Sequence, residues 1–388
     1  MLFARLTCSH LPVLQCMTEF CEGQCISKMQ ADLKLARATL LRPQPSDYCF
    51  SSPTEKPKLI VVIDTEEEFD WSGGFSPKNT SVHSMRSIHR AQQIFDQYNI
   101  TPVYVVDYPV VVQKDGYQPL SEIYAAGHCI IGAHLHPWVN PPFSEATNGR
   151  DSFPGNLPRT VESEKLRILG EMIGERFGAG PVIYKAGRYG IGPNTAEILE
   201  EQRYEVDLSI CPHMDYSAEA GPDFSASTAW PYWFGKRRLL ELPLTVGFAG
   251  VLRHWGSRLH RSATNPLCES LHAPGFLARS GLLNKIWLSP EGYKENELKA
   301  LVRALYGKGL RIFSFAFHSP SVEPGHTPYV RSQRELESFL DRCSSFFDFF
   351  LGDLSGVPTT PLGLKAQLIH EVHEGARTTH RGDAEYAE

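Results

Sequence analysis

Short apolar runs of strand length alternate with longer amphipathic segments along most of this 388-residue chain. Residues 59–63 and 103–106 are continuous apolar runs, which are typical of strands buried on both faces. Residues 82–98 and 160–177 instead repeat apolar side chains at helical spacing. Strands that alternate with helices form parallel sheets covered by those helices. The pattern therefore predicts an α/β protein, either a (β/α) barrel or a doubly wound sheet.

The same alternation sets the expected domain boundaries. It runs through residues 57–352, which we predict to be one barrel domain. Within it, residues 247–290 lack a clear period and are expected to form a lid or an insertion. Residues 1–56 end in a proline-rich stretch and are predicted to be a poorly ordered extension and linker. A chain that begins at Glu55 should then melt near the full-length protein, and residues 353–388 should form a fraying tail.

Composition excludes several classes of protein. The hydrophobic share of 42% and the charged share of 21% are those of an ordinary globular protein. The formal net charge is −6 and no basic block occurs, so nucleic acid is not expected as a partner. No apolar stretch reaches the length of a transmembrane segment, and the first residues form no clear signal peptide. A cytoplasmic protein is the default expectation.

Four of the nine cysteines crowd the amino terminus, at Cys8, Cys16, Cys21 and Cys25. With His10 they could form a zinc knot, although their spacing fits no paired CxxC pattern. A poorly ordered extension is the alternative that the weak periodicity of this region favours. The other cysteines are scattered and are expected to be buried, reduced thiols.

Two apolar strands end in side chains that bind metals. His134 and His136 lie at i and i+2 of one strand, so both imidazoles should project from the same face. Residues 59–63 lead directly into Asp64 and Glu66. No glycine-rich dinucleotide fingerprint follows that strand, which favours a barrel with its site at the carboxyl ends of the strands. The alternatives are ordinary hydrogen-bonded histidines and a solvated acidic loop.

A third histidine, His318, ends the last predicted strand, residues 311–317. The first and last strands of a barrel are neighbours, so His318 should face the carboxylates of the first strand. Metal ligands, a carboxylate base and a separate imidazole acid together suit hydrolysis of an amide or an ester.

These motifs resemble the NodB-type polysaccharide deacetylases, carbohydrate esterase family 4, and within it the WalW-like branch. The resemblance covers residues 58–350 in the family's motif order. It is carried by Asp64-Thr-Glu66, by the shortened His134-Leu-His136, by the turn at residues 183–190, and by residues 315–318 ending in His318. It implies a distorted (β/α) barrel of seven or eight units. It also implies a divalent metal ion, with zinc as the expectation, and a substrate that is an N- or O-acetylated carbohydrate.

The resemblance assigns roles residue by residue. It implies that Asp64 is the base, that Glu66, His134 and His136 are the metal ligands, and that His318 is the acid. The cation that orients the base could be Lys185 or Arg188, and we assign Arg188. Asp207 and Asp215 lie near the place of a further family motif, but no role is assigned to them.

Aromatic side chains in the predicted loops are candidates for stacking on sugar rings. We predict Trp138, Tyr189 and Trp233 as substrate-binding residues, with core packing as the alternative. Two other functions remain open from the sequence. One is a noncatalytic glycan-binding protein of the same fold, since fold does not guarantee activity. The other is a hydrolase of an amide that is not a sugar.

Overall fold

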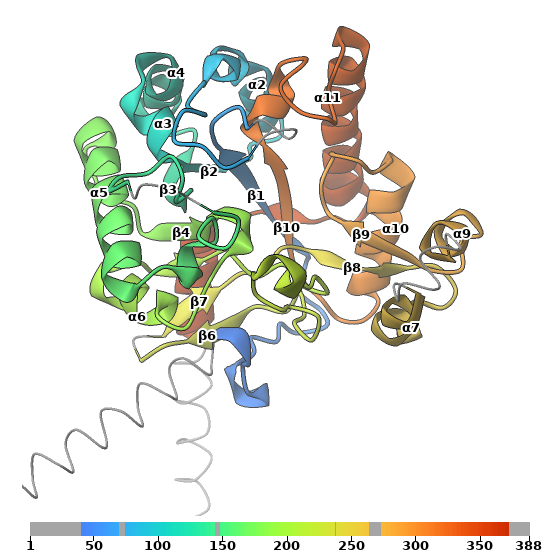
Figure 1. Ribbon diagram of the computed structural model, residues 1–388. Helices are drawn as coiled ribbons and strands as arrows, with labels where there is room; N and C mark the ends of the chain where they lie inside the picture. The colour runs from blue at the N-terminus through green and yellow to red at the C-terminus, as the bar shows by residue number, and fades with distance from the viewer. Residues whose placement is uncertain (1–39, 70–73, 144–147, 237, 264–272, 372–388) are drawn as a thin grey trace, which may run out of the picture.

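A curled sheet forms the centre of the computed structural model, which describes residues 40–69, 74–143, 148–236, 238–263 and 273–371 (Figure 1). Its strands run in the order β10-β1-β2-β3-β4-β5-β7-β6. In addition, β11 pairs with the first two residues of β1. Neighbours from β10 to β7 are parallel, whereas β6 is antiparallel to β7. The strands are β1 (Lys58–Thr65), β2 (Val103–Val106), β3 (Ile130–Leu135), β4 (Ile183–Ala186), β5 (Val206–Asp207), β6 (Tyr232–Phe234), β7 (Leu239–Glu241), β10 (Ile312–His318) and β11 (Val357–Pro358). The predicted α/β barrel class is confirmed.

Helices cover the outer face of this sheet (Figure 1). They are α2 (His89–Gln97), α3 (Tyr108–Val112), α4 (Lys114–Ala125), α5 (Arg159–Phe177), α6 (Thr195–Glu201), α10 (Glu295–Tyr306) and α11 (Gln333–Phe347). The segment expected to be irregular holds a second, two-stranded antiparallel sheet of β8 (Val246–Ala249) and β9 (Asn284–Trp287), with α7 (Gly256–Ala263) and α9 (Ala273–Arg279) beside it. The sequence shows no clear period here because these elements are short, with only four residues in each strand.

The second sheet bridges the gap between β7 and β10, where the main sheet has no strand pairing. The Ser314 amide donates to Thr245 Oγ1 at 2.8 Å, and the Ala316 amide donates to the Leu288 carbonyl at 3.1 Å. The Leu288 amide in turn donates to the Thr245 carbonyl at 2.8 Å. Isolated hydrogen bonds thus take the place of regular strand pairing on this side of the barrel, and the barrel is distorted there.

Alternation along each strand separates two layers of core. In β1, Leu59, Val61 and Ile63 belong to the cluster that packs against the helices. Ile60 and Val62 belong to a smaller cluster inside the barrel. Because side chains alternate along a strand, the inward series continues into Asp64 at the carboxyl end. The same parity carries polar side chains inward at the ends of β3, β4 and β10.

The described segments on either side of the predicted domain, residues 40–56 and 353–371, pack on the barrel more extensively than predicted. Leu40 is 1% exposed, and its carbonyl accepts a hydrogen bond from the Tyr232 hydroxyl at 2.5 Å. In the second of these segments, Leu364 and Leu368 join the cluster inside the barrel. The boundaries at residues 56 and 353 are therefore wrong, because residues 40–56 and 353–371 bury apolar side chains on the domain. A chain that begins at Glu55 would lose the Leu40 contact and should be destabilised.

The cysteine-rich segment with Cys8 and His10 lies outside the described residues. Four cysteines within the described part are buried free thiols, as expected: Cys49, Cys129, Cys211 and Cys343. Among the described helices, none combines the length and the apolar character needed to cross a bilayer.

Two acids form a buried pair on β5 and β7. Asp207 and Glu241 are register partners, and both are fully buried. Burial and the Asp207 charge raise the pKa of Glu241 well above its usual range, and burial raises the pKa of Asp207 to about 6. Glu241 therefore keeps its proton in the folded state. This pair is directed away from the inward series, so Asp207 is a structural residue.

This pair should make the protein less stable at alkaline pH. Glu241 has a higher pKa folded than unfolded, so its contribution is complete below the unfolded pKa of about 4.3. The contribution is lost as pH rises through the folded pKa. We expect the melting temperature to fall from pH 6 to pH 9, and to fall less in Glu241→Gln, which cannot ionise. Exposed Glu122→Gln is the control and should follow wild type. Equal pH dependence in Glu241→Gln and wild type would contradict this assignment.

Candidate active site

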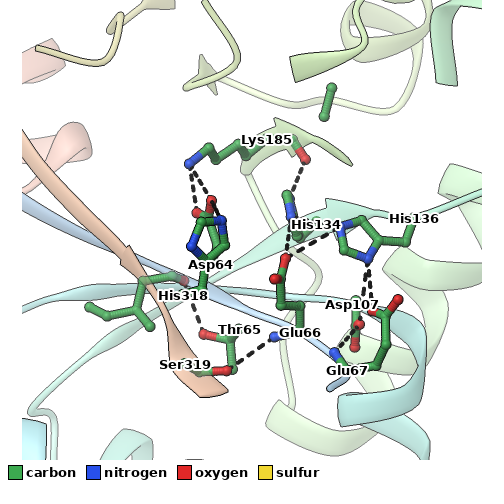
Figure 2. A network of polar contacts seen from close by, with 12 residues as sticks. Asp64, Thr65, Glu66, Glu67, Asp107, His134, His136, Lys185, His318 and Ser319 are labelled. Carbon is green, nitrogen blue, oxygen red and sulfur yellow. Dashed lines mark hydrogen bonds and ion pairs between the residues drawn. The ribbon is translucent and has the colours of Figure 1, made fainter. Parts of the chain in front are cut away.

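Three buried side chains converge at the carboxyl ends of β1 and β3 (Figure 2). His134 Nε2 and His136 Nε2 lie 3.0 Å apart, and each lies 3.4 Å from Glu66 Oε2. All three residues are less than a tenth exposed. The sequence prediction that the two histidines share one face is confirmed by this convergence.

The donor set fits a divalent metal ion. Metal–ligand bonds of about 2.1 Å in a tetrahedral site place ligand atoms roughly 3.4 Å apart, close to the observed spacing. Two imidazole lone pairs and a carboxylate oxygen that face one another repel unless a cation lies between them. Burial lowers the pKa of His136, which favours the neutral, ligating form. These residues, Glu66, His134 and His136, could therefore hold a metal ion.

Further groups hold each histidine in the tautomer that leaves Nε2 free. His134 Nδ1 lies 3.0 Å from the Lys185 carbonyl oxygen. His136 Nδ1 lies 2.7 Å from Glu67 Oε2, while Trp138 Nε1 donates to the other Glu67 oxygen at 2.7 Å. The Glu67 amide donates to Asp107 Oδ2 at 2.7 Å. Such outer hydrogen bonds orient ligands and raise their basicity, so Glu67 is a positioning residue for His136.

A lysine inside the barrel orients the predicted base. Lys185 Nζ donates to both carboxylate oxygens of Asp64, each at 2.6 Å. Burial opposes ionisation of Asp64, but the Lys185 charge, His134 and His318 hold its pKa below the usual value. Asp64 is thus ionised at neutral pH, as a proton acceptor must be.

The assignment of the orienting cation to Arg188 is corrected. Lys185 is an inward position of β4, in register with His134, whereas Arg188 follows the strand with a φ of 54°. Its guanidinium group pairs with Glu219 and lies 4.0 Å from the Phe153 ring centroid. Arg188 lines the rim of the pocket, and strand parity is the reason that Lys185 alone reaches Asp64.

His318 lies across the mouth from the metal ligands and contacts a second carboxylate. His318 Nδ1 lies 2.8 Å from Glu291 Oε2, and His318 Nε2 lies 3.9 Å from Asp64 Oδ2. Ser321 donates to the other Glu291 oxygen. Burial opposes protonation, but the charges of Glu291 and Glu66 raise the His318 pKa to about 10. The imidazole therefore carries a proton at neutral pH.

Removing the Glu291 charge should lower that pKa. Glu291 is the largest influence that raises it, so Glu291→Gln should shift the His318 titration to lower pH. NMR titration of the imidazole in chelator-treated protein measures the shift. Glu323→Gln is the control, since this carboxylate pairs with Arg90 at the rim. An unchanged His318 titration in Glu291→Gln would contradict the assignment.

Gly187 allows the β4 turn to pass close to His136. A Cβ atom at this position would lie 2.5 Å from His136 Cδ2 and 2.5 Å from the Leu135 carbonyl oxygen. Any side chain there must displace the imidazole or the backbone.

We expect Gly187→Ala to weaken metal affinity because it moves a proposed ligand. Disturbing a ligand's support typically lowers affinity about ten- to hundredfold. Titration with zinc against a competing chelator measures the loss. Gly180→Ala is the matched control, because a Cβ there meets no atom within 4 Å. Equal affinity of Gly187→Ala and wild type would show that the turn tolerates a side chain.

Aromatic side chains wall the pocket above the proposed ligands. This pocket of about 370 Å³ is lined by Phe69, Phe75, Trp138, Tyr189, Tyr216, Trp287 and Tyr329, with Asp64, Glu66, His134, His136, Ala186, Arg188 and His318. Trp138 is 2% exposed and stacks on His136 with ring centroids 4.3 Å apart, so it supports the ligand besides lining the wall. Tyr189, at a φ of 58°, holds a left-handed conformation that is uncommon for large side chains and is found at functional sites.

The prediction for Trp233 is wrong. Trp233 lies in β6 and packs beside the cluster inside the barrel, under the Arg238 guanidinium group at 5.0 Å. It does not line the aromatic pocket described above. The sequence shows an aromatic residue near a turn, but only the fold shows on which side of the barrel it lies.

Sequence reasoning missed Glu67, Asp107 and Glu291. Asp107 directly follows the apolar run of β2, a strand-end signal like that of Asp64. Glu67 lies within a run of three glutamates, and the sequence alone does not show which of them has which role. Glu291 lies at the end of a segment without a clear period, so no local pattern marked it.

No family model matches this sequence, and no curated protein matches it either. Several solved structures align with this chain at low identity. A protein described as a polysaccharide deacetylase from Mycobacterium smegmatis has a TM-score of 0.47 and 15% identity, over 85% of this chain and 95% of that one. An allantoinase has a TM-score of 0.44 and 16% identity, over 81% and 91%. The peptidoglycan deacetylase PdaC from Bacillus subtilis has a TM-score of 0.37 and 11% identity, over 86% and 99%.

Proposed function

We propose that this chain is a metal-dependent hydrolase that removes N- or O-acetyl groups from a carbohydrate, in the manner of the WalW-like branch. The observation that supports this most is the placement of an ionised Asp64 and a protonated His318 beside Glu66, His134 and His136. A base, an acid and a metal triad at one pocket are the parts that amide hydrolysis needs.

A divalent ion, which we propose to be zinc, would acidify a water molecule and polarise the substrate carbonyl. Glu66, His134 and His136 would hold it. Asp64 accepts the proton of the attacking water, and Lys185 keeps the carboxylate oriented through two bonds of 2.6 Å. Proton acceptance is possible because Asp64 is ionised at neutral pH.

His318 completes the reaction. As the water oxygen bonds to the carbonyl carbon, the carbon–nitrogen bond breaks and the amine leaves with a proton from His318 Nε2. Glu291, bound to Nδ1 at 2.8 Å, keeps the imidazole charged and aimed. The products are a carboxylic acid and an amine, and the Asp64 proton returns the imidazole to its charged state.

The aromatic walls support a carbohydrate as the amine part of the substrate. Phe75 and Trp138 lie 4.9 Å apart on one side, and Tyr189 stacks on Tyr216 at 5.8 Å on another. Flat aromatic faces suit the apolar faces of sugar rings, and the polar rim can bind hydroxyl groups.

Acetate release from N-acetylated oligosaccharides tests this proposal. Zinc- or cobalt-loaded protein should release acetate, whereas chelator-treated protein and Asp64→Asn should release little. A glycan-binding protein without turnover would bind the oligosaccharide and release none. Release of acetate from small nonsugar amides alone would instead support a hydrolase of another substrate class.

A further inference from the structure

A second chamber opens from the reacting centre into the barrel. It has a volume of about 290 Å³ and shares Asp64, Tyr189, Trp287, His318 and Tyr329 with the aromatic pocket. The proposed metal ligands line only the aromatic pocket. Its inner wall is formed by the side chains of Leu244, Thr245, Leu288, Ser289, Ser314 and Ala316. The mechanism above leaves this inner chamber without an occupant.

The two cavities meet where an amide would react. A carbonyl carbon held between Asp64 and His318 carries two substituents, the amine part and the acyl chain, that leave in different directions. The inner chamber lies deeper in the barrel than the aromatic pocket, because Ser314 and Ala316 precede His318 in the inward series of β10. The aromatic pocket lies above the proposed ligands, at the carboxyl ends of the strands, and has room for a bulky amine part. The deeper chamber, with Leu244, Leu288 and Ala316 in its wall, is therefore the side for the acyl chain.

The volume of the inner chamber exceeds what an acetyl group needs. One water molecule takes up about 30 Å³ in the liquid, and a methyl group is of similar size. A chamber of about 290 Å³ has room for a chain of several carbons. An acetyl group would fill only part of the chamber, whereas a longer chain would bury more apolar surface and bind more tightly.

We propose that the inner chamber binds the acyl group of the substrate and selects N-acyl chains longer than acetyl. This inference rests on the proposed hydrolase function and extends its acyl substrate from acetyl to longer chains. Ala316 limits the chamber on β10, and Leu244 limits it on the segment after β7. Both side chains limit the length of the acyl chain that the chamber accepts, and the chamber does not include the proposed metal ligands.

The test compares glucosamine oligosaccharides that carry N-acetyl, N-butyryl or N-hexanoyl groups, with amine release as the measurement. One added methylene in an apolar pocket typically changes kcat/KM about 10-fold or more. We expect zinc-loaded wild type to prefer a longer chain over acetyl by at least about tenfold. Ala316→Leu should lower the hexanoyl-to-acetyl ratio by a similar factor, and Leu244→Ala should raise it. Phe75→Leu, in the aromatic pocket only, is the control and should leave the ratio unchanged.

The outcomes separate this inference from the function on which it rests. Hydrolysis of the acetyl substrate alone would overturn the inference and keep the proposed function. Hydrolysis of no substrate would overturn both. If both chamber variants keep the wild-type ratio, the acyl chain lies elsewhere. Leu244→Ala decides the question should Ala316→Leu fail to fold, because it removes atoms instead of adding them.

Discussion

Replacing His318 with glutamine should lower kcat on an N-acylated substrate by roughly 10²- to 10⁴-fold, the usual contribution of a general acid. Glutamine cannot deliver the proton that the leaving amine needs. Asp64→Asn should lose a similar factor, because an amide cannot accept the proton of the attacking water. Both variants should keep their metal, since neither residue is a proposed ligand. Rates and metal content measured on the same preparations check this.

The control for His318 is His326, which lines neither of the two cavities. His326 Nδ1 lies 3.3 Å from Glu68 Oε2, and its side chain is 29% exposed. His326→Gln should keep most of the wild-type turnover. Near-normal turnover in His318→Gln would show instead that His318 is a structural residue at the end of β10.

Changing both His134 and His136 to alanine should abolish metal binding and, with it, turnover. Two of the three proposed ligands are then gone. Loss of a residue that only supports a ligand typically lowers metal affinity about ten- to hundredfold, and loss of two ligands should lower it further. Metal content after dialysis and titration with cobalt both measure the loss. His128→Ala, before β3 and paired with Asp96 at 3.0 Å, is the control. Full metal retention in the double variant would contradict the site.

A large part of the site follows from strand parity and could be predicted from the sequence. His134 and His136 share a face because side chains alternate along a strand. Asp64 and His318 meet because β1 and β10 are neighbours in register, a consequence of closing the barrel. These relations depend on local periodicity and on the order of elements, both of which can be read from the chain.

Other features depend on contacts between residues far apart in the sequence, which no local pattern encodes. Glu291 reaches His318 only because the two-stranded sheet of β8 and β9 fills the gap beside β10. Lys185, not Arg188, orients Asp64, since the residue that faces inward depends on where β4 ends. Trp233 lies outside the aromatic pocket because β6, which carries it, packs on another side of the barrel.

The sequence by itself determined the fold class and the residues most able to bind a metal, because periodicity and side-chain chemistry are local properties. Only the tertiary structure decided which groups support those residues, how far the terminal segments belong to the domain, and that a second chamber adjoins Asp64. All three features depend on packing between segments that are distant in the sequence. The apolar surface of such segments is buried only when they come together in the folded core.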